Sequence, residues 1–552
     1  MTSKAELAER DRGILHLSRL LEKEWVIISL LVAWGLFVYY HQLGYPLKGE
    51  EAHYAAIARR IVRTGEWLRF EYEGHPYLNK PPLHFWMIAL SFLAWGPTEF
   101  AVRFPTATFG IGTMLLVYYC GKVLYHRRIG LVAALITTTT LSTVWNARIA
   151  KVDTELGFWM NLALFAFYVA YRGGGRRFGY LCLAFVAMAT GTMVKGPVAV
   201  LLPGVTALAL LVITRRSKAP REIPFLLAGL GIFLLITGPY YQSLGGAFNR
   251  HFFVGENLTR IWGGGSPAFF YFYAIFSEFF PWSLLLPSAG IYLWKSRSRS
   301  LGEGELLLLV WMVGFFLLLS LPAYKGARFL TYLIPPFALL LARYSEHLFS
   351  ESERLQLVED RLLRITATVL ALTTFVALFV GPRLIRMRYR IPADFVPVPF
   401  ALLIGVGCVA VAYTALRTRP QGIFVGMMAV ALVMTFGLVQ FFYPALGRYA
   451  SPIPISLQVR EKVRDSPLVI SDPRNGFTYE IVYYLDRPYP VPLLQTADEI
   501  HAAFRAERPL FGLLAKERYE ELELRGDLPL LRVADYSYRK MDMVLVANRD
   551  RL

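Results

Sequence analysis

The sequence is poor in cysteine, with three among 552 residues. Cys120, Cys182 and Cys408 each lie within an apolar run, so they indicate no disulfide framework. No internal repeat is evident, which argues against the paired halves typical of many transporters. The last hundred residues contain no phosphate-binding glycine loop and no metal-ligand spacing, so their sequence indicates neither chemistry.

Apolar residues are abundant, at 55% of the chain, and they gather in runs that neighbouring residues extend to roughly 18–25 residues. Such runs are long enough to cross ~30 Å of hydrocarbon as helices. No small-residue cleavage site follows the first run, so we expect it to stay as an anchor. The sequence therefore predicts a polytopic α-helical membrane protein. Examples of these runs are Trp25–Tyr40, Leu131–Leu141, Leu156–Val169, Phe225–Ile236, Leu306–Leu321 and Ile365–Val380.

The formal net charge of +18 lies largely in short connections between the apolar runs. This is the pattern of cytoplasmic loops, so we expect no nucleic-acid partner and expect the bilayer itself as a partner. The basic connections carry Arg127, Arg128, Arg172, Arg176, Arg177, Arg215, Arg216, Lys218, Lys295, Arg297, Arg299, Arg417 and Arg419.

The same charges predict a topology. Leu83–Trp95 has only thirteen residues, and a full crossing there would place most basic loops outside, so we interpret it as a juxtamembrane or re-entrant helix. About thirteen transmembrane helices remain in residues 1–442, with outer-side loops at 45–82 and 240–267. Residues 443–552 then lie on the outer side.

Residues 443–552 have the composition of a small α/β domain. Apolar runs of strand length occur at Leu468–Ser471, Ile481–Tyr484 and Met543–Ala547. Charged stretches with helical periodicity lie between them, at Thr496–Ala506 and Ala515–Leu524.

The first outer loop predicts an amphipathic helix lying in the membrane interface. Tyr54, Ile57, Ala58, Ile61 and Val62 form one apolar stripe, the arginines take the other face, and Gly65 is a plausible stop. Glu50 stands four residues before Tyr54, on the stripe. A carboxylate there is costly unless that end of the helix opens into a wet cavity. Alternatively, Glu50 and Glu51 only stabilise the helix, because negative side chains interact favourably with the positive end of its dipole.

Other polar and ionisable residues are predicted on the same side of the membrane. Any one of them alone is typical of a helix-end side chain that reaches the interface. Several in one leaflet indicate a set of carboxylates and cations around a phosphate. These residues are Lys80, Asp153, Lys195, Glu256, Asn257, Tyr324, Lys325 and Arg328.

The order of these motifs resembles that of the GT-C membrane glycosyltransferases. Within them it resembles the branch that contains bacterial 4-amino-4-deoxy-L-arabinose lipid A transferases and protein O-mannosyltransferases. The matching motifs are the acidic pair followed by Ala-x-Tyr-Ala-x-Ile-Ala, Lys80-Pro81-Pro82, Phe100-Ala101-Val102-Arg103-Phe104-Pro105, Asp153, Lys195-Gly196-Pro197, Glu256-Asn257-Leu258 and Phe280-Pro281-Trp282.

Four departures from that family affect the predicted chemistry. The family usually has Asp-Glu where this chain has Glu50-Glu51, and His53 stands where an arginine is common. The aminoarabinose transferases often carry Glu before Lys-Pro-Pro and a His in a large outer loop, a pair able to hold a metal. Here the corresponding residues are Asn79 and, by our alignment, Ser266, so we expect no required cofactor and no zinc site.

The resemblance implies an inverting transferase that takes a sugar from polyprenyl (undecaprenyl) phosphate at the periplasmic face of the bacterial inner membrane. The implied acceptor is lipid A or a related envelope glycolipid; a polypeptide acceptor, as for O-mannosyltransferases, is the alternative, and a lipid-linked sugar transporter is a third. We predict Glu50 and Asp153 as catalytic residues. The residues predicted to bind the donor phosphate or substrate are Glu51, His53, Tyr54, Lys80, Lys195, Glu256, Asn257, Tyr324, Lys325 and Arg328.

Overall fold

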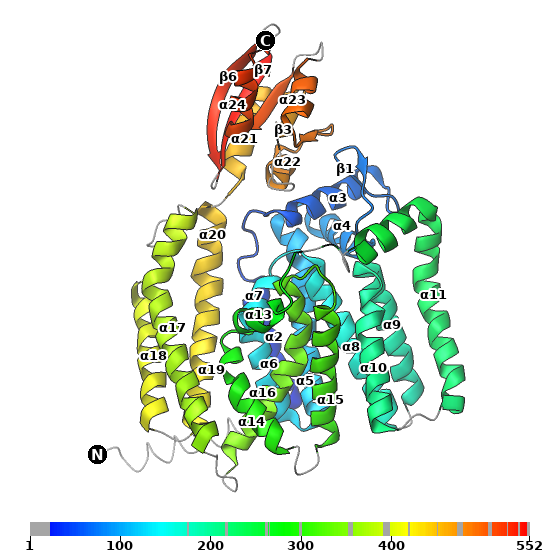
Figure 1. Ribbon diagram of the computed structural model, residues 1–552, viewed down its shortest axis with the longest axis vertical. Helices are drawn as coiled ribbons and strands as arrows, with labels where there is room; N and C mark the ends of the chain where they lie inside the picture. Colours follow the sequence, from blue (N-terminus) through cyan, green and yellow to red (C-terminus); the bar gives the residue numbers. More distant parts are fainter. Residues whose placement is uncertain are drawn as a thin grey trace.

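The computed structural model consists of a large helical part with a smaller α/β unit at one end (Figure 1). It describes residues 23–173, 176–215, 219–259, 263, 265–296, 301–350, 357–389, 398–417, 420–449, 451–471, 478–505, 510–526, 528–538 and 541–548.

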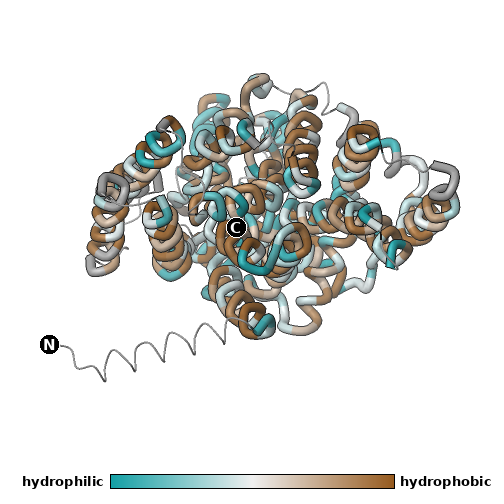
Figure 2. The backbone as a smooth tube through the Cα atoms, turned by 90° about the horizontal axis from the view of Figure 1, so that it is seen from below, coloured by the Kyte–Doolittle hydropathy of each residue, from teal (hydrophilic) through white to brown (hydrophobic). Residues whose placement is uncertain are grey.

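Long helices run side by side through the helical part (Figure 1). Many of their large apolar side chains are exposed, among them Leu208, Val212, Leu235 and Leu372. Figure 2 shows hydrophobic residues along the peripheral helices as well as between them, as expected for helices that contact lipid. These helices are α2 (Glu24–Tyr40), α5 (Glu99–Leu124), α6 (Arg127–Thr139), α8 (Val152–Arg172), α9 (Arg177–Lys195), α10 (Val198–Thr214), α11 (Ala219–Asn249), α13 (Phe270–Glu278), α14 (Leu286–Ser296), α15 (Glu303–Ser320), α16 (Ile334–Phe349), α17 (Leu357–Tyr389), α18 (Val398–Arg417) and α19 (Pro420–Gly437).

Five helical segments in the described part of the chain are long and apolar enough to cross a membrane, or six if the bent pair α13 and α14 counts as one span. Four shorter apolar helices accompany them, α2, α4 (Leu83–Trp95), α10 and Phe400–Tyr413. The chain is thus a polytopic helical membrane protein, and the number of about thirteen spans stays a prediction.

Short elements cap the end of the helical part that carries the α/β unit (Figure 1). The helix α3 (Glu50–Thr64) ends at Gly65, which takes a left-handed φ of 73°, as its predicted stop requires. α4 has the predicted bounds of the short apolar helix. The other short elements are β1 (Glu71–Tyr72), β2 (His75–Pro76), α7 (Leu141–Asn146), the π-helix η1 (Arg250–Leu258) and the 3₁₀-helices η2 (Trp282–Leu285) and η4 (Ala327–Leu333).

The apolar stripe of α3 packs on protein and not on lipid, whereas the position of this helix in the membrane interface stays a prediction. Ile57, Ala58 and Ile61 are buried in one cluster with Phe85 and Ile88 of α4. The sequence could not distinguish the two environments, because a lipid surface and an apolar helix select the same side chains. The stripe itself is as predicted, with Tyr54 also buried.

The α/β unit contains a five-stranded sheet of order β4-β3-β5-β7-β6. β3 is parallel to β4 and β5, whereas β7 is antiparallel to β5 and β6. Leu468 pairs with Phe511, and Leu513 with Leu545. The elements are α21 (Ile453–Val463), β3 (Leu468–Ser471), α22 (Tyr479–Leu485), β4 (Leu493–Leu494), α23 (Ala497–Phe504), β5 (Phe511–Ala515), α24 (Lys516–Arg525), β6 (Leu530–Tyr538) and β7 (Met541–Asn548).

The strands predicted at Leu468–Ser471 and Met543–Ala547 are present, and the two predicted helices correspond to α23 and α24. The strand predicted at Ile481–Tyr484 is wrong, because that stretch forms α22. Its run of Ile, Val and Tyr favours a strand locally, but the helix buries Ile481 in the unit and Tyr483 against α3. Before α21, η6 (Leu438–Phe442) and α20 (Tyr443–Tyr449) follow α19, so the sheet-containing unit begins at Ile453.

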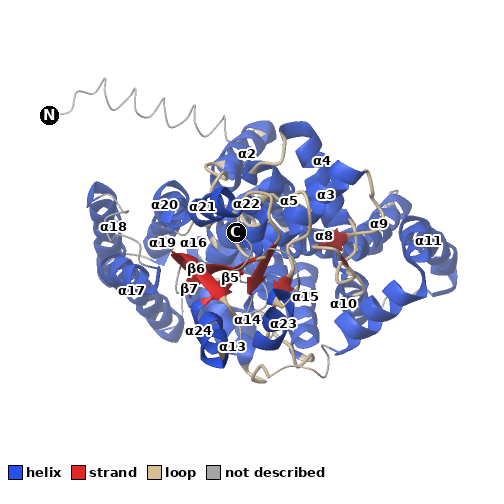
Figure 3. Ribbon diagram, turned by 90° about the horizontal axis from the view of Figure 1, so that it is seen from above, coloured by secondary structure: helices blue, strands red, loops and turns tan. Residues whose placement is uncertain are grey.

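The α/β unit sits over the middle of the helical part when seen from above (Figure 3) and contacts α3 through α22. Asp486 forms ion pairs with Arg59 at 2.9 Å and Arg63 at 2.8 Å. The Tyr484 hydroxyl accepts a hydrogen bond from the backbone N–H of Leu47 at 2.8 Å and donates to Glu99 at 2.9 Å. The C-terminal unit is therefore bonded to the segment that leads into Glu50.

Candidate functional site

Asp153, in the first turn of α8, is the centre of an ion-pair cluster near α3. Its Oδ1 accepts hydrogen bonds from the Lys195 ammonium and from the Tyr332 hydroxyl, the latter at 2.5 Å. Its Oδ2 lies 3.2 Å from Nε of Arg328. The side chain is 2% exposed, so three donors and little solvent surround the carboxylate.

Glu50 joins this cluster from the N-terminus of α3. Its Oε2 lies 3.2 Å from Nη1 of Arg328 and 3.1 Å from Nζ of Lys151. Arg328 therefore bridges Glu50 and Asp153. Burial alone would raise the pKa of Glu50, but Lys151 and Arg328 outweigh it and lower this pKa below its usual value. At 43% exposure, the Glu50 side chain remains accessible to a substrate.

Local backbone features bring the cluster together. Lys195 is the last residue of α9, and Gly196 follows it at a φ of 101°. A Cβ on Gly196 would lie 2.6 Å from the Phe252 ring, so only glycine fits this turn. The chain then starts α10 after Pro197, while η4 presents Arg328 and Tyr332 from the opposite side.

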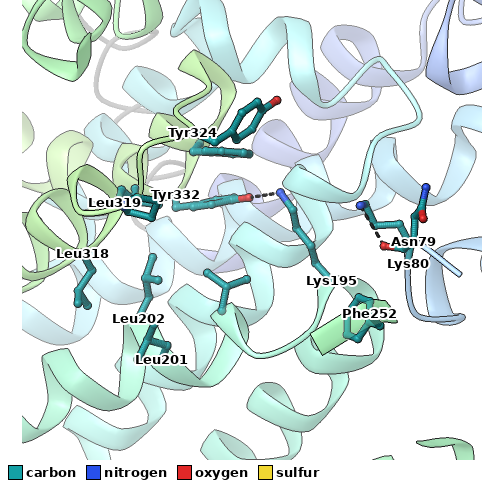
Figure 4. A pocket seen from close by; sticks show the side chains of 13 residues that line it. Asn79, Lys80, Lys195, Leu201, Leu202, Phe252, Leu318, Leu319, Tyr324 and Tyr332 are labelled. Atoms are coloured by element: carbon teal, nitrogen blue, oxygen red, sulfur yellow. Dashed lines mark hydrogen bonds between the residues drawn. The ribbon is translucent and has the colours of Figure 1, made fainter. Parts of the chain in front are cut away.

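A cavity of about 160 Å³ opens beside Lys195 and Tyr332 (Figure 4). Its polar end carries Lys80, Asn79, Lys195 and Tyr324, and its other wall is apolar, with Leu201, Leu202, Leu318 and Leu319 of α10 and α15. The ammonium of Lys195 also lies 4.3 Å from the centre of the Phe329 ring. Cations at the end of an apolar slot suit a lipid with an anionic headgroup.

Lys80 and Lys325 take different positions around this cavity. The Lys80 ammonium donates to the backbone carbonyl of Asn79 at 3.1 Å and lines the cavity. The Lys325 ammonium donates to the carbonyl of Pro322 at 2.9 Å, and its backbone N–H donates to Ser266. Lys325 is thus held within its own turn, next to cavity residues Pro322 and Tyr324.

Glu51, predicted to contact substrate, instead has a structural position. Its two oxygens accept hydrogen bonds from Nε and Nη2 of Arg103, both at 2.8 Å. The backbone N–H groups of Ala150 and Lys48 donate to the same carboxylate. The pair is almost completely buried, and with four bonds to the carboxylate no acceptor site remains for a ligand.

His53 and Tyr54 lie on α3 beyond Glu50 and outside the ion-pair cluster. Tyr54 is buried, edge-on to His84 and Phe85. His53 packs among the rings of Tyr72, Tyr77 and Tyr479. Glu256 and Asn257 belong to η1, but their side chains lie outside the described residues.

The predicted alignment of Ser266 with the metal-binding histidine of the aminoarabinose transferases stays a prediction. The imidazole next to Asn79 is that of His251, with Nε2 3.0 Å from Oδ1 of the amide. Ser266 instead accepts a hydrogen bond from the backbone of Lys325. In the part of the chain that the structure describes, no three His, Cys, Asp or Glu side chains come together in a group that could hold a metal ion.

Several residues of the cluster were not predicted from the sequence. Lys151 pairs with Glu50, and the Tyr332 hydroxyl donates to Asp153. Arg103 orients Glu51. A further buried pair joins α4 to α8, with Nδ1 of His84 2.9 Å from Oε1 of Glu155. Arg103 belongs to one of the matching motifs, and Lys151 stands two residues before Asp153. The sequence did not indicate their roles, because their partners Glu51 and Glu50 are distant in the chain.

The arrangement can bind an anion and assist displacement next to it. Lys195 and Arg328 provide positive charge around the Asp153 carboxylate, and Lys80 adds a third cation at the cavity. Such fixed charges stabilise a departing phosphate more effectively than water does. Glu50 is an accessible carboxylate at the edge of the same cluster.

Comparison with known proteins agrees with this chemistry. Residues 79–241 match the family model described as dolichyl-phosphate-mannose-protein mannosyltransferase. The undecaprenyl phosphate-alpha-4-amino-4-deoxy-L-arabinose arabinosyl transferase of Pectobacterium carotovorum is 28% identical over 76% of this chain and 77% of its own length. An uncharacterized protein of Aquifex aeolicus is 29% identical over 64% and 69%, respectively.

The fold is that of a known membrane enzyme. ArnT from Cupriavidus metallidurans, in a crystal structure bound to undecaprenyl phosphate, superposes with a TM-score of 0.73 at 19% identity. The match covers 95% of this chain and 98% of that one. The apo structure of the same protein gives a TM-score of 0.72. The chain is therefore a membrane glycosyltransferase of the GT-C type, resembling the aminoarabinose transferases and the protein O-mannosyltransferases.

Proposed function

We propose that this glycosyltransferase moves a sugar from a polyprenyl phosphate to a glycolipid acceptor of the lipid A type, on the periplasmic side of the bacterial inner membrane. The observation that carries the proposal is the cavity between α10 and α15, apolar along its wall and cationic at its end. A prenyl chain fits the apolar wall, and its phosphate fits Lys80, Lys195 and Arg328. The related enzymes named for undecaprenyl-phosphate sugars support this donor class.

The reaction is a single displacement at the anomeric carbon. The acceptor oxygen forms the new bond to that carbon, and the bond to the lipid phosphate breaks, so the phosphate departs with the electron pair. Attack from the face opposite the phosphate inverts the anomeric configuration. Lys195 and Arg328 offset the charge that develops on the phosphate.

Glu50 orients the acceptor and receives its proton when the acceptor is a hydroxyl. An acceptor phosphate is already anionic near neutral pH and needs no base, so Glu50 then only positions the group. Asp153 is bonded to Lys195, Tyr332 and Arg328 and is only 2% exposed, so we propose that it positions the two cations. This assignment replaces its predicted catalytic role.

The direct test uses the purified protein, a labelled polyprenyl-phosphate sugar and two isolated acceptors, lipid A and a serine/threonine-rich polypeptide. We expect label to enter lipid A with inverted configuration. Transfer to the polypeptide alone would support protein O-glycosylation, which the match to the mannosyltransferase model favours. If the protein moved the intact donor lipid across vesicle membranes and transferred no sugar, it would be a transporter, and the proposed enzymatic function would be wrong.

A further inference from the structure

A second cavity lies on the other side of Asn79, between the first outer loop and the C-terminal unit. It has a volume of about 200 Å³. Its walls come from three separate parts of the chain, with His53 on α3, Glu73 and Tyr77 in or next to the β1–β2 hairpin, and Leu493 on β4. Tyr479 of α22 completes it.

The cavity adjoins the reaction centre. Asn79 lines both this cavity and the cationic one, and His53 follows Glu50 by three residues, less than one turn of α3. Glu50 and Lys80 are also close enough to act electrostatically on His53. A molecule in this cavity could therefore extend to the anomeric carbon of a donor bound at Lys80 and Lys195.

The lining suits a hydroxyl-bearing ring. Tyr72, Tyr77 and Tyr479 surround His53 with ring centres 4.0, 5.1 and 4.6 Å from its own. Aromatic rings present electron-rich faces, which attract the slightly positive C–H groups of a sugar ring. Glu73 is held at the cavity by the backbone N–H of Val491, which donates to its Oε2.

His53, in the lining of this cavity, has a polar atom without a hydrogen-bond partner in the described part of the chain. Its Nε2 is buried without a hydrogen-bond partner among the described residues. Burial lowers the pKa of His53 to about 4, against the opposing effect of Glu50, so the ring is neutral at neutral pH. A neutral imidazole can pair with a hydroxyl as donor or as acceptor.

Charge distinguishes the second cavity from the first. Its lining contains no Lys or Arg among the described residues and includes the Glu73 carboxylate, so it does not suit a phosphate.

We propose that this cavity binds a sugar ring of the acceptor headgroup, adjacent to the position that receives the transferred sugar, so that the C-terminal unit selects the acceptor. The inference rests on the proposed function and adds a specificity-determining site to it. Tyr479 and Leu493 give the C-terminal unit this role, because they are its two contributions to the cavity wall.

The test is a kinetic comparison of full-length variants in detergent, with a labelled polyprenyl-phosphate sugar as donor and purified lipid A as acceptor. Leu493→Trp fills the cavity from the β4 side, and Glu73→Gln removes its carboxylate while keeping its shape. Leu524→Trp, at an exposed position on α24, is the matched control. Binding of the donor lipid is measured separately by its displacement of a fluorescent polyprenyl phosphate.

We expect Leu493→Trp to raise the KM for lipid A at least ~10-fold and Glu73→Gln to raise it by a factor of about 3, with donor binding unchanged. Leu524→Trp should match the parent protein. A parent protein that binds donor and transfers sugar to lipid A, with unchanged acceptor KM in both cavity variants, would overturn the cavity assignment alone. Failure of the parent protein to use lipid A, or use of a polypeptide instead, would overturn the proposed function first.

Discussion

At the scale of single residues, Glu50 and Glu51 are neighbours with different surroundings. Glu50 is accessible and shares Arg328 with Asp153, whereas Glu51 is buried against Arg103. Glu50→Gln keeps the shape and loses only partly exposed ion pairs, so it should fold normally. With a hydroxyl acceptor, its kcat should fall at least ~10²-fold, the usual scale for loss of a general base. Turnover and thermal unfolding measured on the same preparation check this.

Glu51→Gln should give the opposite result. It leaves Arg103 charged and buried with a neutral partner, and breaking a buried pair costs about 3–5 kcal/mol. We expect a clearly lower melting temperature with turnover per folded molecule within a few-fold of the parent. A Glu51→Gln protein that is stable but has lost turnover would show that Glu51 takes part in catalysis.

The pH dependence of turnover also reports on Glu50. Because Lys151 and Arg328 lower its folded-state pKa, the carboxylate stays ionised below the ordinary glutamate value of about 4.3. The stability that these ion pairs provide is present above the unfolded pKa and is lost as the pH falls through the lowered folded pKa. Activity that declines already between pH 7 and 6 would point to another group as the base.

Metal removal tests the prediction that the enzyme requires no zinc. Asn79 faces His251 through its amide oxygen, and a neutral amide is a weak ligand for zinc. We expect the enzyme to keep its turnover after treatment with a strong chelator and dialysis. Activity that disappears and returns with added zinc would show that other ligands hold a metal.

At the scale of elements, α22 fixes the entry into α3. The Tyr484 hydroxyl bridges the Leu47 N–H and Glu99, so Tyr484→Phe leaves a backbone donor without this partner. Such a loss costs about 1–3 kcal/mol. Because Leu47 lies three residues before Glu50, turnover should fall several-fold. Tyr489→Phe is the control, since among the described residues that hydroxyl donates to the carbonyls of Asp465 and Ser466, both within the C-terminal unit. Equal kinetics of both variants would argue against the coupling.

The sequence predicted those elements whose signals are local. The stripe of α3, its stop at Gly65 and the strand Leu468–Ser471 depend on periodicity and on single residues. The helix α22 was missed because contacts with α3 outweigh the strand preference of Ile481–Tyr484. In the same way, Glu50, Asp153 and Lys195 could be singled out as charges near a membrane. The connection of Glu50 to Asp153 through Arg328, and the burial of Glu51 by Arg103, depend on contacts across 52 to 278 residues.

At the scale of the whole molecule, α3 and the C-terminal unit must lie on one side of the membrane, because they touch. We expect Arg69→Cys and Lys462→Cys, both at exposed positions, to react with an impermeant maleimide added to intact spheroplasts. Arg128→Cys, in a basic connection, should react only after permeabilisation. Each variant is made after replacement of Cys120, Cys182 and Cys408. Labelling of Arg128→Cys in intact spheroplasts, with Arg69→Cys protected, would invert the proposed orientation.

The bond between Leu47 and Tyr484 also bears on how the protein is made. Its two residues are separated by 437 positions in the sequence. At about 5–20 residues per second, a ribosome needs roughly 20–90 s to proceed from one to the other. During that time α3 has emerged without the helix that holds its entry. The Glu50 carboxylate therefore takes its final position only after α22 has been synthesised and has packed on α3.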